Sequence, residues 1–288
     1  MGLFMKIDEQ LLFKTIDTAL KEDLGTNGDI TSDAVFMDSD QAEAVVKSKA
    51  EGVVSGIYLL KPLFTKIDDK LRVELKIADG DKIQKGTVLC TLHGPVKAIL
   101  AGERIALNFL QRLSGIATIT SKYVESIKHT NARLLDTRKT TPMLRYFEKL
   151  AVLHGGGCNH RFGLFDMILI KDTHVKRAGG VGKALVNALN FRGNDTSLKI
   201  EVEVQSVAEL EEALQFDPDR IMLDNMSIAD MKKSVEIVEL SGKHAELEAS
   251  GNITLTTIAA VAETGVDFIS CGSITHSAPS LDIHLVII

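Results

Sequence analysis

The sequence predicts an α/β protein with a small α/β sandwich in its N-terminal part and a larger region of repeated β/α units after it. Strand-like alternation dominates between about residues 42 and 100. After residue 129, short β-branched runs alternate with helical stretches, and their polar ends recur at roughly 22 to 33 residues. Strands and helices that alternate in this way are typical of parallel β/α units. The 288 residues suffice for one large or two ordinary domains.

The N-terminal part begins with a predicted amphipathic helix over residues 8 to about 23. Its apolar positions are Leu11, Leu12, Ile16 and Leu20. Gly25 and Gly28 are expected to end it. In the strand-like stretch that follows, Val73, Leu75 and Ile77 alternate with polar residues. Residues 98–129 then predict a helix, with a break expected near Ser114-Gly115.

Six short apolar runs form the repeated region. They are ARLLDTRK, DMILIKDTH, LKIEVEVQS, DRIMLDNMS, ELEASGN and DFISCGS. Six parallel units favour either a barrel-like closure or a doubly wound sheet, because a complete eightfold barrel needs more strands. In both architectures the carboxyl ends of the strands converge on one site. The sequence therefore predicts a single pocket built from the polar residues that end these runs.

The predicted rim of this pocket changes character along the chain. Its members are Arg138-Lys139, His160-Arg161, Lys171, Glu201, Glu203, Asp224-Asn225, Ser250-Gly251-Asn252 and Cys271-Gly272-Ser273. Glycine-rich β→α turns offer backbone N–H groups to a phosphate, and clustered arginines suit carboxylates or pyrophosphate. The acidic residues can bind sugar hydroxyls or Mg²⁺. Glu201 and Glu203 alternate on one strand face, so an interior ion-pair role stays open for them.

The composition indicates a globular protein in which any cationic site must be local. Hydrophobic residues make up 45% and charged residues 25% of the chain, and the formal net charge is −6. The acidic excess argues against a nucleic-acid surface. No apolar run approaches the ~20 residues that span a bilayer. We therefore expect no nucleic acid and no membrane among the partners.

The start of the chain and its cysteines predict a cytoplasmic protein. MGLFMKIDEQ has neither the long apolar core nor the small-residue cleavage site of an export signal. Lys6 stands where a myristoylation signal has Ser or Thr. Cys90, Cys158 and Cys271 are scattered and odd in number, as expected of reduced thiols.

Three other chemistries find no support. RAGGVGKA (177–184) departs from a P-loop, because Arg177 precedes its glycines and Ala184 follows the lysine. His154, Cys158 and His160 lack standard zinc spacing and a fourth ligand nearby. No nucleophile motif for acyl-enzyme chemistry occurs.

Eight motifs follow one another along nearly the whole chain. They are EDLGTNGDITSD (22–33), GERIALNFLQRLSGIAT (102–118), DTRKTTPMLR (136–145), GGGCNHRFGLFDMILIKDTH (155–174), EVEVQS (201–206), MLDNMS (222–227), EASGNI (248–253) and GSITHSAPSLDI (272–283). In this order they are similar to the quinolinate phosphoribosyltransferase family, also called carboxylating nicotinate-nucleotide pyrophosphorylases. The resemblance implies an N-terminal α/β sandwich over residues 1–112, joined by the tail 279–288. It also implies an incomplete TIM-like barrel with fewer than eight strands over residues 113–278.

The resemblance also implies a set of site residues. Arg138, His160 and Arg161 correspond to the pocket for the pyridine dicarboxylate, and Arg104 corresponds to an arginine that the partner subunit of a head-to-tail homodimer delivers. Lys139 and Lys171 correspond to lysines near the reacting centre and the pyrophosphate, and their division of roles stays open. Glu201 and Asp224 correspond to acids that bind ribose and Mg²⁺. The phosphate pocket corresponds to Ser250, Gly251, Gly272 and His276.

The implied reaction joins quinolinate to phosphoribosyl pyrophosphate (PRPP) and gives nicotinate mononucleotide, pyrophosphate and CO₂. The implied catalytic residues are Lys139, Lys171, Glu201 and Asp224. A sibling transferase acting on nicotinate or another base stays open, as does a non-catalytic phosphosugar-binding protein. A hexamer is an alternative to the dimer.

Overall fold

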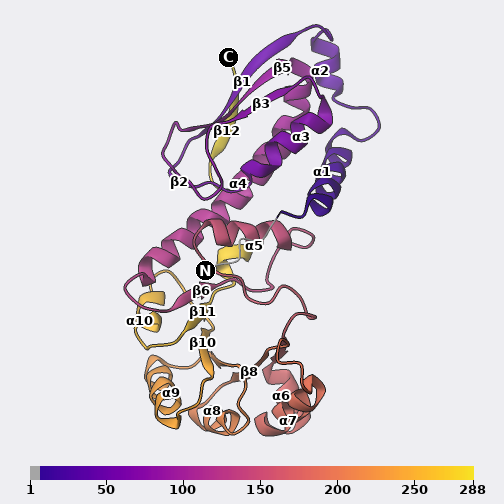
Figure 1. Cartoon of the computed structure of the whole chain (residues 1–288). Helices are drawn as coiled ribbons and strands as arrows, with labels where there is room; N and C mark the ends of the chain where they lie inside the picture. The colour runs from indigo at the N-terminus through magenta and orange to yellow at the C-terminus, as the bar shows by residue number, and fades with distance from the viewer. Residues whose placement is uncertain (1–6) are drawn as a thin grey trace. The chain divides into compact units, whose positions relative to one another are not determined.

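The computed structural model describes residues 7–288, which form two compact units (Figure 1). The first unit contains the chain up to Ser121, the segment Met143–Gly156 and the segment Ala278–Ile288. The second contains Lys122–Pro142 and Gly157–Ser277. The sequence predicted boundaries at 112/113 and 278/279, whereas the chain changes unit four times, at 121/122, 142/143, 156/157 and 277/278. The predictions about export and lipidation that depend on residues 1–6 lie outside the described residues.

An antiparallel sheet forms the centre of the first unit, with strand order β12-β1-β5-β3. Its strands are β1 (Gln41–Ser48), β3 (Arg72–Leu75), β5 (Val88–Pro95) and β12 (Ile283–Ile287). A separate pair joins β2 (Gly52–Val53) to β4 (Lys82–Ile83). Because β12 pairs with β1 along Ala44 to Ser48, the C-terminal end of the chain is built into this unit.

The helices of the first unit surround an apolar core that includes Leu60, Phe64 and Leu92. They are α1 (Glu9–Leu24), α2 (Ile30–Val35), the 3₁₀ turn η1 (Ile57–Leu59), α3 (Leu60–Ile67), α4 (Val96–Ile127) and α5 (Arg145–His154). The prediction of α1 is confirmed. Its first turn is capped by Asp8, whose side chain accepts from the N–H of Leu11, and its C-cap is Gly25 with φ 52°.

The predicted break at Ser114-Gly115 is wrong, because α4 runs without interruption from Val96 to Ile127. A Cβ on Gly115 would lie 2.1 Å from the carbonyl oxygen of Pro279. The glycine therefore serves close packing of the C-terminal segment against the helix and does not end the helix. Ser114 is also buried, and its hydroxyl accepts from the N–H of Ser55 at 3.0 Å.

Six parallel strands form the sheet of the second unit, in the order β6-β11-β10-β9-β8-β7. They are β6 (Arg133–Leu135), β7 (Ile168–Ile170), β8 (Ile200–Val204), β9 (Arg220–Asp224), β10 (Glu246–Ser250) and β11 (Phe268–Ser270). All six predicted runs are confirmed as strands. The edge strands are β6 and β7, so the sheet is an incomplete TIM-like barrel with fewer than eight strands, as predicted.

Helices follow the strands of the second unit as crossover connections. They are α6 (Asp172–Ala178), α7 (Val181–Arg192), α8 (Val207–Leu214), α9 (Ile228–Ser241), α10 (Ile258–Ala262) and α11 (Ser273–His276). Ser206 caps α8 and Ser227 caps α9, each by accepting from the backbone N–H three residues later. This arrangement places the carboxyl ends of the six strands at one end of the barrel.

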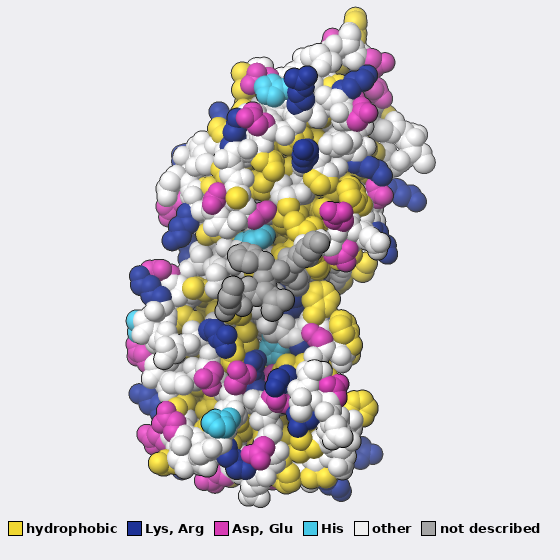
Figure 2. Space-filling view, in the orientation of Figure 1, with side chains coloured by type: hydrophobic (Ala, Val, Ile, Leu, Met, Phe, Trp, Pro, Cys, Tyr) yellow, Lys and Arg dark blue, Asp and Glu magenta, His cyan; other side chains and the backbone are white. Residues whose placement is uncertain are grey.

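The surface carries charges of both signs. On the face seen in Figure 2, Lys and Arg side chains are intermixed with Asp and Glu side chains. Over residues 7–288, no helix combines the length and the apolar character that crossing a membrane requires.

Candidate active site

A pocket of about 350 Å³ lies at the carboxyl ends of the strands of the second unit. Every strand of the six-stranded sheet ends at or beside it. The residues that line it are Thr137, Arg138, Lys139, His160, Arg161, Leu169, Lys171, Glu203, Met222, Asp224, Ser250 and Ser270. The structure thus brings together most of the residues that the sequence analysis placed on one rim.

Two arginines give one part of this pocket its positive charge. Burial lowers the pKa of the Arg161 guanidinium, and the charge of Arg138 lowers it further. The Arg161 side chain is oriented by donating from Nη1 to the carbonyl of Met167 at 3.0 Å. Two like charges held close together in a partly buried place favour an anion between them.

Two lysines extend the positive charge. The Lys139 ammonium makes no hydrogen bond or ion pair with any side chain or backbone group of residues 7–288. The Lys171 ammonium lies 3.0 Å from Oε1 of Glu203, and Oε2 of Glu203 accepts from the N–H of Asp172 at 3.1 Å. Lys139 is therefore available to a ligand, whereas Lys171 is oriented by an acid of the neighbouring strand.

Asp224 and Glu203 are the acids that line the pocket. Asp224 ends β9, and its carboxylate has no hydrogen-bond or ion-pair partner within the described part of the chain. The sequence analysis assigned the ribose- and Mg²⁺-binding role to Glu201 instead of Glu203. Glu201 lies two residues before Glu203 on β8, deeper in the barrel. It is fully buried and does not line the pocket. Alternation in IEVEV showed that both side chains share a face, but it did not show which one reaches the pocket.

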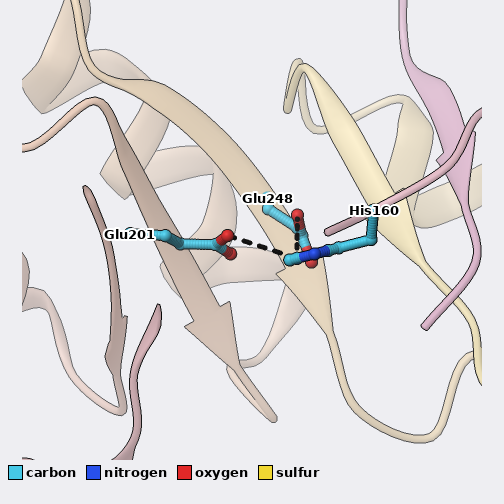
Figure 3. A group of neighbouring side chains, drawn as sticks. All are labelled: His160, Glu201 and Glu248. Atoms are coloured by element: carbon cyan, nitrogen blue, oxygen red, sulfur yellow. Dashed lines mark ion pairs between the residues drawn. The ribbon is translucent and has the colours of Figure 1, made fainter. Parts of the chain in front are cut away.

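Glu201 instead belongs to a buried group below the pocket. Figure 3 shows Glu201 and Glu248 pointing at the His160 ring from two strands. The Nε2 atom of His160 lies 3.2 Å from Glu201 Oε2 and 3.4 Å from Glu248 Oε2. Arg220 contacts the same oxygen of Glu248, with Nη1 3.0 Å from Oε2. Sequence analysis did not single out Glu248 or Arg220, although both occupy predicted strands.

The protonation of this group is set by opposing effects. Burial lowers the pKa of His160, but the adjacent carboxylates of Glu201 and Glu248 outweigh it and raise the pKa to about 9. Nδ1 of His160 accepts a hydrogen bond from the N–H of Arg161 at 2.7 Å. Protonation of Nδ1 would break this bond, so the bond opposes the increase in the His160 pKa. Burial and then the charge of Glu248 raise the pKa of Glu201. Burial also acts to raise the pKa of Glu248, yet the contacts with His160 and Arg220 leave it lowered.

The glycine-rich end is the predicted phosphate group of Ser250, Gly251, Gly272 and His276, of which Ser250 lines the pocket and the other three do not. Gly251 has φ +102°, and a Cβ there would lie 2.2 Å from Oδ1 of Asn225. A Cβ on Gly272 would lie 2.9 Å from Cδ of Lys139 and 3.3 Å from Cδ2 of His276. Both glycines therefore allow close approach of backbone to side chains, as a phosphate site requires.

Two asparagines support this end. Asn225 (φ 55°) and Asn252 (φ 50°) both adopt the left-handed conformation, and Asn252 Nδ2 donates to Asn225 Oδ1 at 3.1 Å. The N–H of Asn225 donates to the carbonyl of Ser250 at 2.8 Å. This contact fixes the loop after β9 to the end of β10. The sequence signal was present, because asparagine tolerates the left-handed region, but no role was assigned to either residue.

Asp136 attaches the His160 loop to the barrel. This fully buried carboxylate accepts from the N–H of His160 at 2.9 Å and from Nδ2 of Asn159 at 2.6 Å. It follows the last residue of β6 directly, so it links the end of that strand to the segment before β7. Asp136 belongs to the motif DTRKTTPMLR, but no pattern in the sequence indicated its role.

Arg104 belongs to the first unit, where it lies on α4. It lines a separate cavity of about 490 Å³ with apolar neighbours that include Leu11, Phe109 and Leu144. Its guanidinium makes no hydrogen bond or ion pair with any group of residues 7–288. The residue is exposed and its guanidinium is unpaired although Glu22 and Asp23 also line the cavity, so it is available to an anion.

Two groups of residues in the second unit offer carboxylate oxygens to a cation. His160, Glu201 and Glu248 offer three ligand atoms within 4.8 Å of one another, but the Arg220 guanidinium already neutralises Glu248 there. Asp224 and Glu203 offer carboxylate oxygens in the pocket itself, and those of Asp224 have no partner among the described residues. Oxygen donors of this kind fit Mg²⁺.

Two family models match the chain in succession. Residues 29–114 match the N-terminal domain of quinolinate phosphoribosyl transferase, and residues 116–286 match its C-terminal domain.

Whole proteins give the same result. The chain is 44% identical over 285 residues to quinolinate phosphoribosyltransferase [decarboxylating] 1b of Nicotiana tabacum, covering 94% of this chain and 81% of that protein. It is 42% identical over 274 residues to the probable nicotinate-nucleotide pyrophosphorylase [carboxylating] of Bacillus subtilis, covering 95% of this chain and 92% of that protein. The nicotinate-nucleotide pyrophosphorylase structure from Francisella tularensis superposes with a TM-score of 0.93 at 38% identity, covering 100% of both chains. The chain therefore belongs to the quinolinate phosphoribosyltransferase family.

Proposed function

We propose that this protein transfers the phosphoribosyl group of PRPP to quinolinate, with decarboxylation, and releases nicotinate mononucleotide, pyrophosphate and CO₂ in the biosynthesis of NAD. The observation that supports this best is the pocket of the second unit. It combines two arginines and two lysines with Asp224, Glu203 and a glycine-rich end. A dicarboxylate beside a phosphorylated sugar is the ligand set that matches this combination.

The arginine part of the pocket suits the two carboxylates of quinolinate. Arg138 and Arg161 repel each other there, and Arg161 is partly buried. A bound dicarboxylate relieves this repulsion and forms charge-assisted hydrogen bonds with planar guanidinium groups. Nicotinate, with one carboxylate, would leave part of this charge unneutralised.

The other part of the pocket suits PRPP. The backbone at Ser250, Gly251 and Gly272, together with His276, provides the phosphate end. Asp224 and Glu203 stand where ribose hydroxyls would lie between the phosphate and the pyridine ring. These two acids are also the residues that would hold Mg²⁺, and Glu203 takes the place first assigned to Glu201. When bound, Mg²⁺ neutralises negative charge on the diphosphate.

In the transfer step the pyridine nitrogen forms a bond to C1 of the ribose, and the bond from C1 to the pyrophosphate oxygen breaks. The electron pair of that bond leaves with pyrophosphate, so positive charge develops at C1. The carboxylates of Asp224 and Glu203 stabilise this charge, and Lys139 and Lys171 stabilise the leaving group. No covalent enzyme intermediate is required.

The alkylated pyridine nitrogen prepares the second step. The bond between the ring and the neighbouring carboxylate breaks, and CO₂ leaves. The electron pair stays on the ring carbon, where the adjacent cationic nitrogen stabilises it until a proton is added. The pocket's task in this step is to orient the carboxylate and limit the access of water.

We further propose a homodimer in which Arg104 of one subunit completes the pocket of the other. The support is an Arg104 guanidinium without a partner among the described residues, on a unit that does not itself line the pocket. A hexamer built from such dimers stays open. The proposed location is a reducing compartment such as the cytoplasm, supported by three cysteines that form no disulfide.

The test is an assay of CO₂ and pyrophosphate release with PRPP and quinolinate, with PRPP and nicotinate, and with PRPP alone. The proposed function predicts that both products appear only with quinolinate. Pyrophosphate release with nicotinate at an equal or higher rate would indicate a sibling transferase. Binding of PRPP without turnover of either acid would indicate a phosphosugar-binding protein.

A further inference from the structure

The interior of the barrel below the pocket contains an unusual run of alternating charges. It passes from Glu246 at the surface through Arg220, Glu248 and His160 to Glu201. Glu201 and Glu248 are both fully buried. Barrel interiors are usually filled with branched apolar side chains, and such a filling is at least as stabilising as buried ion pairs. The charged filling therefore indicates a task other than stability.

The run is rigid at its lower end. The Arg220 guanidinium lies 3.9 Å above the centre of the Phe268 ring and contacts two glutamates, Glu246 at 2.9 Å and Glu248 at 3.0 Å. A guanidinium held by stacking and by two carboxylates has little freedom to move. Glu248 is therefore fixed from below, and its carboxylate presents a defined surface to His160.

At its upper end the run reaches the pocket through His160. Its ring lines the pocket, but Nε2 faces Glu201 and Glu248 rather than the ligand space (Figure 3). Its backbone N–H is held by Asp136 at 2.9 Å, and the next residue is Arg161. Whatever fixes the His160 ring therefore also fixes the start of the Arg161 side chain.

The geometry points to Glu201 and Glu248 as positioning residues that hold the His160 ring, and with it Arg161, at the end of the pocket that takes the dicarboxylate. This inference rests on the proposed function, because quinolinate is the ligand whose binding it explains. It predicts an effect on one substrate only. The residues assigned to the phosphate lie at the end of β10 and around α11, whereas His160 and Arg161 lie in the segment before β7.

The test compares the KM for quinolinate with the KM for PRPP in Glu201→Gln, which keeps the size of the side chain and removes its charge. We expect the quinolinate KM to rise on the order of tenfold, as for groups that orient metal-binding histidines. The PRPP KM should stay within about twofold of wild type. Glu201→Asp keeps the charge but withdraws the carboxylate, and a smaller rise is expected. Glu248→Gln should act on the same substrate.

The matched control is Glu263→Gln. Glu263 lies 3.2 Å from His129, the same distance as Glu201 from His160, but both members of that pair are exposed. It should leave both KM values unchanged. Thermal unfolding of each variant shows whether it is folded. If Glu201→Gln does not fold, the quinolinate and PRPP KM values of Glu201→Asp and Glu248→Gln test the inference instead.

The inference is overturned if the folded variants bind quinolinate as wild type does, or if the KM values of both substrates rise together. The second result would show a general structural role. The proposed function fails separately, if the wild-type protein does not turn over quinolinate at all.

Discussion

Lys171 and Glu203 form an ion pair of 3.0 Å across two neighbouring strands at the mouth of the barrel. The second oxygen of Glu203 accepts from the N–H of Asp172, at the start of α6. This pair places one positive and one negative group on the same pocket wall. A reaction in which a cation develops at the sugar and an anion leaves as pyrophosphate requires both.

Glu203→Gln should lower kcat at least about tenfold, equivalent to ~1.4 kcal/mol of transition-state stabilisation. The reason is that the amide cannot stabilise positive charge at C1 of the ribose and no longer pairs with Lys171. Steady-state kinetics with saturating quinolinate and PRPP measures this. Glu211→Gln, at an exposed position of α8, is the control. An unchanged kcat would remove Glu203 from the proposed mechanism.

Gly251→Ala should raise the PRPP KM strongly. The new Cβ would lie 2.2 Å from Oδ1 of Asn225, and φ is +102°, so the loop after β10 has to move. Gly242→Ala is a matched control, because Gly242 has φ +68° with nothing within 4 Å of the added Cβ. Both variants suffer backbone strain of about 1–3 kcal/mol, but only Gly251→Ala should weaken PRPP binding. Equal PRPP KM values in the two variants would contradict this.

Gly115→Ala should destabilise the protein, although alanine is the better helix former by about 1 kcal/mol. Its Cβ would lie 2.1 Å from the carbonyl of Pro279, and relieving such overpacking costs about 1–3 kcal/mol. Urea unfolding followed by circular dichroism measures the change. Lys122→Ala, at an exposed position of the same helix, should change stability by less than about 0.5 kcal/mol. A more stable Gly115→Ala protein would contradict close packing of Pro279 against α4 at this position.

Acid should destabilise the protein through His154. Burial lowers the pKa of this imidazole, although Asp79 opposes the shift, and the ring contacts the hydroxyl of Ser55 at 2.8 Å. Because the folded pKa is below the unfolded value of about 6.5, stability is complete above that pH and is lost as the pH falls below it. Wild type should therefore lose more in Tm between pH 7.5 and 5.5 than His154→Asn does. Equal losses would count against a buried, neutral His154.

The sequence predicted the strands of the barrel well and the depth of their side chains poorly. Each strand was a short β-branched run with a polar end, and this local signal does not depend on tertiary contacts. The choice between Glu201 and Glu203 depended on how far each strand extends past its neighbours in the barrel. Periodicity reveals which face of the sheet a side chain occupies, but not how deep in the barrel it lies.

Close packing was also beyond the sequence. Gly115 looked like a helix break because its partner, Pro279, is distant in the chain. The segment Met143–Gly156 was expected in the barrel domain and belongs to the first unit instead. Its helical pattern predicted a helix but contained no information on which core the helix joins. Glu248 and Arg220 were missed for a related reason, since a charged residue within a predicted strand is usually at a surface.

The quinolinate KM of Arg138→Ala shows whether the pocket of the second unit takes the dicarboxylate. If the pocket of the second unit binds the dicarboxylate between Arg138 and Arg161, loss of one guanidinium should raise that KM by roughly 30-fold or more, equivalent to ~2 kcal/mol or more. The PRPP KM should change much less. An Arg138→Ala protein whose quinolinate KM and kcat equal those of wild type would show that the dicarboxylate binds elsewhere.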